Sequence, residues 1–293
     1  MSGEISVQGK MDAIQNTFLH VQDIFFESPD WKRHVLELEA TGIEFRSIAY
    51  ESASMSIALE DLKQGEQLTN WLQFLNEAAS AHATQVHVGL GWAFAQALKN
   101  PIDYLAELNP MSRYRVLDGY GYYEGIFRRR RSIINHLKLN VEDTVASSAL
   151  DQGIGRSIWY LNKGVIDDAK NMIEGFAVER HKDLWRGLGI AIAYVGGCDE
   201  ETLQEIFAKS DSYKTQLATG AIMALVSRDS AKYISTDTEL ACKVWCNKTA
   251  EQILELNYSI KSKLDLTGDD AYAKWISELE RHCEALRSNP PNA

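Results

Sequence analysis

Acidic, phenolic and imidazole side chains lie beside recurring pairs of glycines, and these side chains could carry out acid–base chemistry. Asp118, Tyr122 and Tyr123 surround one such pair. His87 precedes an earlier pair. A carboxylate beside a tyrosine can act as a general acid or base when burial moves its pKa toward neutrality. We therefore predict these four residues as catalytic candidates, with a hydrogen-bonded structural role as the alternative for the histidine.

The candidate ligand-binding residues are mainly aromatic and also lie near the glycines. Aromatic faces with phenol hydroxyls at the rim would suit a groove or tunnel for a long apolar or polyene-like ligand. Core packing between helices is the alternative interpretation of the same aromatic residues. The predicted ligand-binding set is Tyr50, Glu51, Trp92, Tyr120, Tyr122, Arg156, Trp159 and Trp185.

Charged residues near the glycines also have two interpretations. They could pair across neighbouring units as a salt-bridge ladder, or they could supply a carboxylate to the site; the residues concerned are Asp118, Glu124, Arg156, Asp183 and Arg186. On the second interpretation, Asp118→Asn and Tyr122→Phe are expected to preserve folding and to weaken binding or turnover. Gly155→Leu is expected to disrupt packing, because it would overfill a close contact between helices.

No established catalytic motif accompanies these residues. The sequence contains no Gly-x-Ser-x-Gly nucleophile elbow, no His-Glu-x-x-His zinc motif and no phosphate loop. Its Gly-x-Gly pairs lack the third glycine and the preceding strand of a dinucleotide-binding fingerprint. Cys242 and Cys246 lie one helical turn apart, but no neighbouring histidine completes a zinc set, so no metal site is predicted. These observations identify neither a reaction nor a cofactor.

One strongly basic run interrupts the acidic sequence, and it consists of Arg128, Arg129, Arg130 and Arg131. Cations at the end of a helix interact favourably with the negative pole of the helix dipole, which is the structural interpretation. Alternatively, the run forms a patch for an acidic protein partner such as an acyl carrier protein.

A sequence repeat predicts the elements that must position these residues. Gly119, Gly153 and Gly187 follow one another at intervals of 34 residues, and a second glycine stands two residues after each. A period of about 34 residues is typical of helix-turn-helix units, which bury their apolar faces by stacking. Glycine inside a helix costs about 1 kcal/mol relative to alanine, so its return in each unit predicts close contact between helices. We therefore predict an all-α fold, a tetratricopeptide-like α-α superhelix.

Two segments resemble tetratricopeptide repeats in detail. Trp185, Leu188, Gly189 and Ile192 have the spacing of the Trp-x2-Leu-Gly-x2-Tyr signature, with the last position relaxed. The segment 164–169 resembles the turn into the second helix of such a repeat.

Apolar spacing and helix breakers predict the positions of the individual helices. The first is expected over 12–26, with Asp12 as its N-cap. Further helices are expected over 31–39, 45–56, 68–79, 88–98, 102–108, 240–256 and, as a terminal cap, 271–286.

Composition predicts a single folded domain. The chain has 293 residues, of which 45% are hydrophobic, and no linker interrupts the repeats. We predict one helical-repeat domain over 1–293, with N-terminal helices in 1–44, repeats in 45–256 and a C-terminal cap and tail in 257–293. The net charge of -11 argues against nucleic-acid binding. No stretch has the roughly 18 apolar residues of a membrane span and no signal core is present, so a cytoplasmic protein is expected.

The ordered motifs at 48–53, 86–93, 118–121, 153–157 and 183–189 resemble those of domain-of-unknown-function family 1702. The resemblance covers roughly 45–246. Members of this bacterial family recur in enediyne and related polyketide gene clusters, often beside membrane electron-transfer-like genes. The family usually carries a histidine where this chain has Tyr123, and if that histidine is a catalytic base, its absence argues against the same chemistry here. The resemblance implies a biosynthetic context without a mechanism.

Two classes of function follow from these observations. The first is a specialised-metabolite biosynthesis protein that binds, and could transform, an apolar polyketide-type or carrier-protein-bound intermediate inside the helical array. The alternative is a non-catalytic tetratricopeptide-like scaffold that organises partner proteins. An enclosed apolar cavity of several hundred cubic ångströms, roughly the size of a ligand pocket, would favour the first class, and an open polar groove would favour the second.

Overall fold

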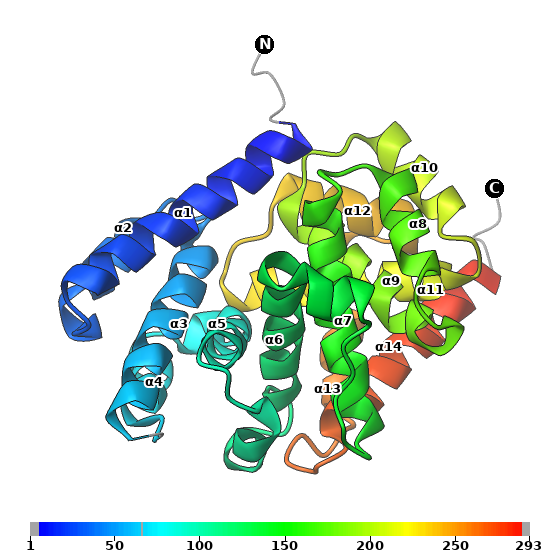
Figure 1. The fold of residues 1–293 in the computed structure, drawn as a ribbon. Coiled ribbons are helices and arrows are strands. Elements are labelled where there is room, and N and C mark those ends of the chain that lie inside the picture. The colour runs from blue at the N-terminus through cyan, green and yellow to red at the C-terminus, as the bar shows by residue number, and fades with distance from the viewer. Residues whose placement is uncertain (1–5, 66, 289–293) are drawn as a thin grey trace.

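A computed structural model describes residues 6–65 and 67–288, and over these residues the chain consists of helices and loops without a strand (Figure 1). The predicted all-α class is therefore confirmed. The α-helices are α1 (Val7–Glu27), α2 (Val35–Ala40), α3 (Arg46–Gln64), α4 (Thr69–Glu77), α5 (Ala83–Gln96), α6 (Arg113–Phe127), α7 (Thr144–Leu161), α8 (Ile166–Glu174), α9 (Val178–Val195), α10 (Glu200–Lys209), α11 (Lys214–Ser230), α12 (Thr236–Cys246), α13 (Ala250–Lys261) and α14 (Ala271–Ser288). The short helices are η1 (Trp31–Arg33), η2 (Ser80–His82), η3 (Pro101–Glu107), η4 (Arg130–Ile134) and η5 (Asp211–Tyr213).

Six long helices, α3, α5, α6, α7, α9 and α11, pack side by side in chain order and form what we call the inner row. In a pair of neighbouring inner helices, residues near the start of one helix contact residues near the start of the other, and later residues contact later ones. Between α6 and the start of α7, for example, the Tyr114 hydroxyl donates to Asp143 at 2.9 Å, and further along Arg156 donates to Asp118 at 2.6 Å. The inner helices therefore run parallel, as a repeat with a fixed period requires.

Glycine pairs allow the inner helices to approach closely. A β-carbon added at Gly153 would lie 1.9 Å from the carbonyl oxygen of Asp118 on the preceding helix. One added at Gly155 would lie 2.1 Å from the carbonyl oxygen of Leu184 on the following helix. The first glycine of each pair thus makes room for the helix before it and the second for the helix after it. This confirms that the recurring glycines mark close helix contacts.

Shorter segments follow most inner helices and form an outer layer. On the C-terminal side, α8, α10 and α12 pack against one another as well as against the inner row. On the N-terminal side the equivalent segments are less regular, since η3 is a 3-10 helix where an α-helix over 102–108 was predicted. Proline at the first position of η3 and the asparagine cap before it suit such a short helix.

Several predicted helix limits were wrong for identifiable reasons. Asp12 lies inside α1, because Ser6 caps that helix by accepting a hydrogen bond from the Gly9 amide. Predicted helix 31–39 divides into η1 and α2. Predicted helix 240–256 divides into α12 and α13, since Asn247 takes a left-handed conformation, with φ 51°, and Thr249 begins a capping box. The predicted tail residues 289–293 lie outside the described residues.

The inner row curls back so that its last helix meets its first ones. Ser227 of α11 donates a hydrogen bond to the Gln85 side chain of α5 at 2.9 Å, across 142 residues of sequence. Helix α1 crosses one end of the curled row (Figure 1), where Ser52 of α3 donates to the Phe18 carbonyl at 2.7 Å. Lys10, nearer the start of α1, forms an ion pair with Asp237 on α12 at 3.4 Å. The curled row and α1 together border the space described next.

Candidate ligand cavity

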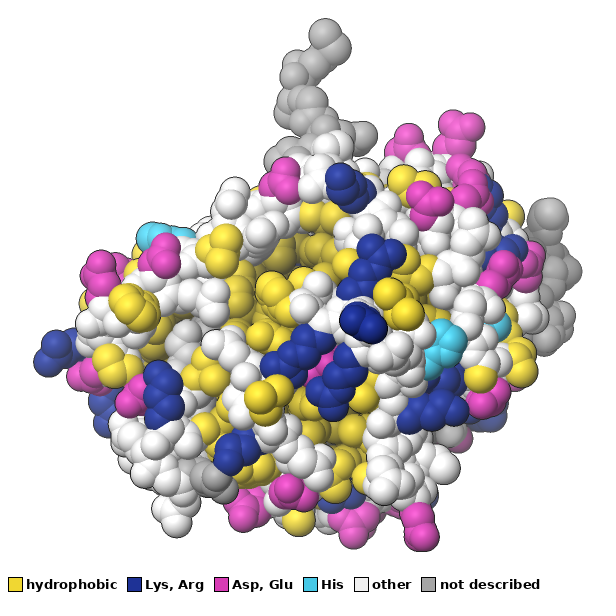
Figure 2. All heavy atoms as spheres, viewed as in Figure 1, with side chains coloured by type: hydrophobic (Ala, Val, Ile, Leu, Met, Phe, Trp, Pro, Cys, Tyr) yellow, Lys and Arg dark blue, Asp and Glu magenta, His cyan; other side chains and the backbone are white. Residues whose placement is uncertain are grey.

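A cavity of about 650 Å³ lies between α1, the first half of α3 and the C-terminal ends of α5, α6, α7 and α9. Figure 2 shows hydrophobic side chains lining a hollow below α1 on this face of the molecule. Most of the lining residues are apolar or aromatic. They are Gln8, Met11, Asp12, Ile14, Gln15, Phe18, Leu19 and Gln22 from α1, with Ile48, Glu51, Met55, Trp92, Gln96, Tyr122, Tyr123, Ile126, Phe127, Arg156, Tyr160, Leu161, Lys163 and Tyr194.

The glycine repeat determines which side chains form the wall. The residue immediately after the second glycine of a pair lines the cavity on three successive helices, as Trp92, Tyr122 and Arg156. One helical turn further, the equivalent positions also line it, as Gln96, Ile126 and Tyr160. Residues four apart lie on one face of a helix, so the close contacts at the glycines place both levels of side chains around one space.

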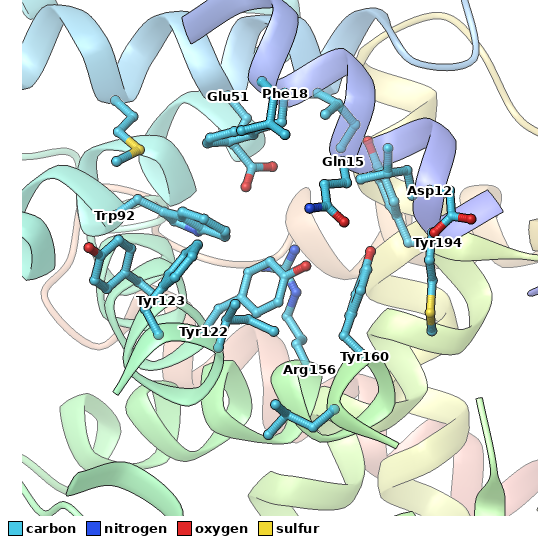
Figure 3. Close-up of a pocket in the computed structure, with 18 of the residues that line it drawn as sticks. Asp12, Gln15, Phe18, Glu51, Trp92, Tyr122, Tyr123, Arg156, Tyr160 and Tyr194 are labelled. Atoms are coloured by element: carbon cyan, nitrogen blue, oxygen red, sulfur yellow. The ribbon is translucent and has the colours of Figure 1, made fainter. Parts of the chain in front are cut away.

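Aromatic rings form one side of the cavity around Trp92. Its ring centroid lies 4.9 Å from that of Phe18 on α1 and 5.0 Å from that of Tyr122 on α6. Tyr123 and Phe127 also pack edge-on against Trp92, at 5.6 and 5.8 Å. In Figure 3 the ring of Tyr123 borders the cavity, but its hydroxyl is directed away from it. This side therefore offers aromatic faces and edges with little polar surface.

A buried carboxyl group faces the cavity from α3. Glu51 is 3% exposed, and Figure 3 shows its carboxyl directed into the space between Trp92 and Gln15. The side-chain amide of Gln85 donates a hydrogen bond to it at 3.1 Å. Burial raises the pKa of Glu51 to about 7; the charge of Asp118 acts in the same direction, while Arg156 and Gln85 oppose it. This carboxyl can therefore exchange a proton near neutral pH.

Phenol hydroxyls lie across the cavity from this carboxyl. Tyr122 and Tyr160 share a hydrogen bond, and in Figure 3 the Tyr160 hydroxyl points into the cavity. Burial raises the pKa of Tyr160 to about 12, so both phenols are neutral at physiological pH. The Tyr194 hydroxyl hydrogen-bonds Ser47 of α3. The phenols therefore occupy the wall as neutral hydrogen-bonding groups.

A ladder of charged and amide groups runs beside the cavity through the middle of α6, α7 and α9. Arg156 donates to Asp118 at 2.6 Å, and its guanidinium lies 4.6 Å from the Tyr122 ring centroid. The Gln152 amide also donates to Asp118, and its carbonyl accepts from Arg186 at 2.9 Å. Asp118, Gln152 and Arg186 follow one another at 34-residue spacing. Asp118 and Arg156 form the expected ion pair between units, whereas Asp183 pairs with Arg186 within α9, and Glu124 pairs with Arg128 and Arg131.

Two of the predicted catalytic candidates lie away from the cavity. Asp118 belongs to the ladder and is not among the lining residues. His87 is buried, with its Nδ1 2.6 Å from the Ala83 carbonyl oxygen and its ring edge-on to Trp71. Burial lowers the pKa of His87 to about 4, so it is neutral at physiological pH. The other two candidates, Tyr122 and Tyr123, line the cavity.

The predicted ligand-binding set is divided in the same way. Glu51, Trp92, Tyr122 and Arg156 line the cavity, whereas Tyr50, Tyr120, Trp159 and Trp185 do not. The Tyr50 hydroxyl donates to Glu39 at 2.5 Å and its ring stacks on His82. Both tryptophans are almost fully buried, and Trp185 stacks on Tyr213. Core packing is therefore the better interpretation for these outlying aromatic residues.

Helix α1 supplies the part of the cavity that sequence reasoning missed. Met11, Ile14, Gln15 and Phe18 follow one another at helical spacing and all face the cavity. Their periodicity predicts an amphipathic helix. It does not say which surface that helix covers, because the contact joins segments far apart in sequence.

The basic run begins at the edge of the cavity. Phe127 lines the cavity, is 61% exposed and ends α6, and Arg128 follows it directly. Arg128 and Arg131 both donate to the buried Glu124 carboxylate, at 2.6 and 3.2 Å. The two arginines between them are exposed. Figure 2 shows Lys and Arg side chains gathered beside the hollow.

Two structural findings bear on other classes of site. Within residues 6–65 and 67–288, no group of three or more His, Cys, Asp or Glu side chains is arranged to hold a metal ion. Cys242 and Cys246 are buried, and their sulfurs face the α11 carbonyl oxygens of Ala221 and Ala218. In the part of the chain that is described, no helix combines the length and the apolar character needed to cross a membrane.

Comparison with known proteins places the chain in a family without identifying its activity. A family model described as "Protein of unknown function (DUF1702)" matches residues 2–283. Neither the curated proteins nor the solved structures include a match to this sequence.

Proposed function

The chain belongs to DUF1702, a family of proteins of unknown function, and we propose that it binds an extended, largely apolar small molecule of the polyketide type in the cavity below α1. The observation that carries this proposal is the cavity itself. Its volume of about 650 Å³ falls within the roughly 300–1,000 Å³ range of small-molecule sites, which are typically apolar with a few polar groups. We place this binding in specialised-metabolite biosynthesis, in keeping with the polyketide gene clusters implied by the family resemblance.

Aromatic surfaces favour a conjugated ligand over a flexible aliphatic one. Phe18, Trp92 and Tyr122 present faces and edges around one side of the cavity. Such rings stack favourably on planar π-systems. Polar side chains at the other side, Glu51 and Tyr160 among them, would fix the orientation of the ligand.

An acid–base transformation is compatible with the same site. Glu51 holds a carboxyl whose pKa is raised to about 7, and general acids and bases work best when their pKa lies near the operating pH. The cavity therefore combines a binding surface with one group able to give or take a proton.

The basic run supports delivery of the ligand by an acidic carrier protein. Arg129 and Arg130 are exposed and follow, within three residues of sequence, Phe127 at the edge of the cavity. Positive charge around the entrance of a site steers an acidic partner toward it. A carrier-bound intermediate could then pass from the partner into the cavity beside Phe127.

The alternative function, a tetratricopeptide-like interaction scaffold, would use the concave surface of the inner row to hold partners. Helix α1 lies across one end of that surface, and its apolar face is buried against it through Met11, Ile14 and Phe18. This contact favours a ligand site that α1 partly covers over an open groove.

Titration with an apolar fluorescent probe tests the proposal. The probe is dimethylaminonaphthalene, whose fluorescence anisotropy rises when a protein immobilises it. Saturable binding by the wild-type chain is expected. Ile126→Trp adds a large ring to the cavity wall and should weaken binding by at least about tenfold. Leu36→Trp, at an exposed position on α2 that is 83% accessible, is the matched control and should bind as wild type does. Absence of wild-type binding, or equal binding by all three proteins, would favour the scaffold.

A further inference from the structure

The buried charges that act on Glu51 do not balance. Asp118 and Glu51 contribute two carboxyl groups, and Arg156 contributes one guanidinium, which is hydrogen-bonded to Asp118 at 2.6 Å. Among residues 6–65 and 67–288, the amide of Gln85 makes the only hydrogen bond to the Glu51 carboxyl. The charge of Glu51 in turn raises the pKa values of Tyr122, Tyr160 and Tyr194, whose phenols supply no positive charge. Glu51 therefore has no counter-ion of its own.

Burial decides the protonation state of such a group. An ionised carboxylate that leaves water without a paired cation carries a large desolvation cost, and a second carboxylate nearby adds repulsion. Asp118 avoids this cost through Arg156 and Gln152. Glu51 avoids it by keeping its proton, which also turns its carboxyl into a hydrogen-bond donor.

We propose that Glu51 presents a protonated carboxyl to the cavity and that it holds a carbonyl oxygen of the ligand together with the hydroxyl of Tyr160. This inference rests on the proposed function and narrows the ligand class to apolar molecules that carry a ketone, ester or quinone carbonyl. Figure 3 shows the Glu51 carboxyl and the Tyr160 hydroxyl directed into the same space.

The phenol pair explains why an acceptor on the ligand is required. Of the two hydroxyl protons of Tyr122 and Tyr160, one is used in the hydrogen bond between them. The second proton is left for another acceptor, as is the proton of Glu51. The nearby guanidinium of Arg156 makes the electrostatic potential favourable for the partial negative charge of a carbonyl oxygen. The polar side of the cavity is thus rich in donors and suited to an acceptor.

Binding of a carbonyl ligand should then depend on pH. Glu51 donates while it is protonated, and when its carboxyl ionises, as pH rises through about 7, the donor is lost and the carboxylate repels the carbonyl oxygen. Loss of one such hydrogen bond corresponds to about a tenfold change in affinity. A ligand without a carbonyl should not show this change.

Two matched probes test the proposal: dimethylaminonaphthalene and its propionyl ketone, titrated at about pH 6 and about pH 8.5, on either side of the Glu51 transition. In the wild-type chain the ketone should bind about tenfold more weakly at the higher pH, and the carbonyl-free probe should bind equally at both. Glu51→Gln keeps an N–H donor that does not titrate, so its affinity for the ketone should be the same at both values of pH. Asp23→Asn removes an exposed carboxyl of α1 that does not line the cavity, and should leave the wild-type pH dependence intact.

The outcomes separate this inference from the function on which it rests. If the carbonyl-free probe binds and the ketone shows no pH dependence, or if Glu51→Gln retains the wild-type dependence, the assignment of Glu51 is wrong while the cavity function stands. If neither probe binds at either pH, both fail. Should Glu51→Gln not fold, the wild-type comparison of the two probes decides alone.

Discussion

Adjacent positions of the repeat have opposite roles in the inner helices: the glycines bring the helix backbones together, and on α5, α6 and α7 the residue after the second glycine lines the cavity. At the glycine level, Gly153 and Gly155 bring backbones so close that a β-carbon would lie about 2 Å from a carbonyl oxygen, 1.9 Å in the first case and 2.1 Å in the second. At the next position, Trp92, Tyr122 and Arg156 turn large side chains into a cavity of about 650 Å³. The tight level fixes the helix spacing, and the open level uses it to form a site.

Two buried carboxyl groups occupy equivalent positions in the repeat but have different surroundings. Asp118 immediately precedes Gly119 on α6, and Glu51 immediately precedes Ser52 on α3. Asp118 is held by Arg156 and Gln152, so its environment is that of a structural ion pair. Glu51 has the equivalent position on α3, but its hydrogen-bonding side chain is the neutral Gln85. Equivalent positions in a repeat therefore differ in function according to what the next helix supplies.

The largest expected effect comes from breaking the tight level. Gly155→Leu places a branched side chain where even a β-carbon would lie 2.1 Å from the Leu184 carbonyl oxygen, so we expect loss of the cooperative folded state. Gly155→Ala should lower the free energy of unfolding by about 3 kcal/mol or more. Urea denaturation followed by circular dichroism measures both. Gly42→Ala, where the added atom meets nothing within 4 Å, is the control, and a similar loss there would contradict the role given to the glycine contacts.

A somewhat smaller loss is expected from breaking the ladder. Asp118→Asn leaves the buried guanidinium of Arg156 without its carboxylate, which should cost about 3 kcal/mol of unfolding free energy. This revises the expectation from sequence that the substitution preserves folding. Asp269 is an exposed partner of Arg113, and its side chain is 89% accessible. Asp269→Asn should therefore change the free energy of unfolding by less than about 1 kcal/mol. Equal urea midpoints for the two variants would show that the ladder contributes nothing.

Replacing Glu51 should raise the free energy of unfolding above neutral pH, whereas replacing Asp118 should lower it. Its pKa is about 7 in the folded chain against an ordinary 4.5, so the folded state binds more protons than the unfolded state between these values. Stability therefore falls as pH rises from about 4.5 to about 7, by roughly 2 to 3 kcal/mol. Glu51→Gln should remove this fall and be the more stable protein near pH 8. Thermal unfolding as a function of pH measures it, and a wild-type profile that is flat across this interval would contradict the buried, unpaired carboxyl.

The smallest effect on stability is expected at the basic run. Replacing Arg129 and Arg130 together by glutamate changes only exposed side chains, and the free energy of unfolding should stay within about 0.5 kcal/mol. Binding of the dimethylaminonaphthalene probe should also be unchanged. Surface plasmon resonance should instead show weaker capture of an acidic acyl carrier protein, with the difference shrinking at high salt. Unaltered capture would remove the proposed carrier contact.

Local pattern was sufficient to predict the fold class and the wall residues that follow directly from the repeat. The 34-residue glycine spacing predicts close helix contacts, and Trp92, Tyr122 and Arg156 are adjacent to those glycines in sequence. Trp159 and Trp185 are also near glycines, yet they lie on helix faces that turn into the core. Closeness to a glycine in sequence does not determine the helix face on which a side chain lies. The prediction therefore included core residues such as Trp159 and Trp185 in the ligand site.

Features that depend on distant contacts could not be predicted. The amphipathic pattern of α1 is visible in the sequence, but its packing across the inner row joins residues that no local signal relates, such as Phe18 and Ser52. The tetratricopeptide-like superhelix, the single-domain organisation and the link to polyketide biosynthesis stay predictions.

Photo-crosslinking with benzophenone tests most directly whether the cavity is the ligand site. Benzophenone is an apolar diaryl ketone, and its excited carbonyl reacts readily with methionine side chains. Met11 and Met55 line the cavity, whereas Met111, Met172 and Met223 do not. After irradiation and digestion, mass spectrometry should find the label on peptides that contain Met11 or Met55, and Ile126→Trp should abolish it. Labelling confined to the other methionines, or unaffected by Ile126→Trp, would contradict a ligand cavity beneath α1.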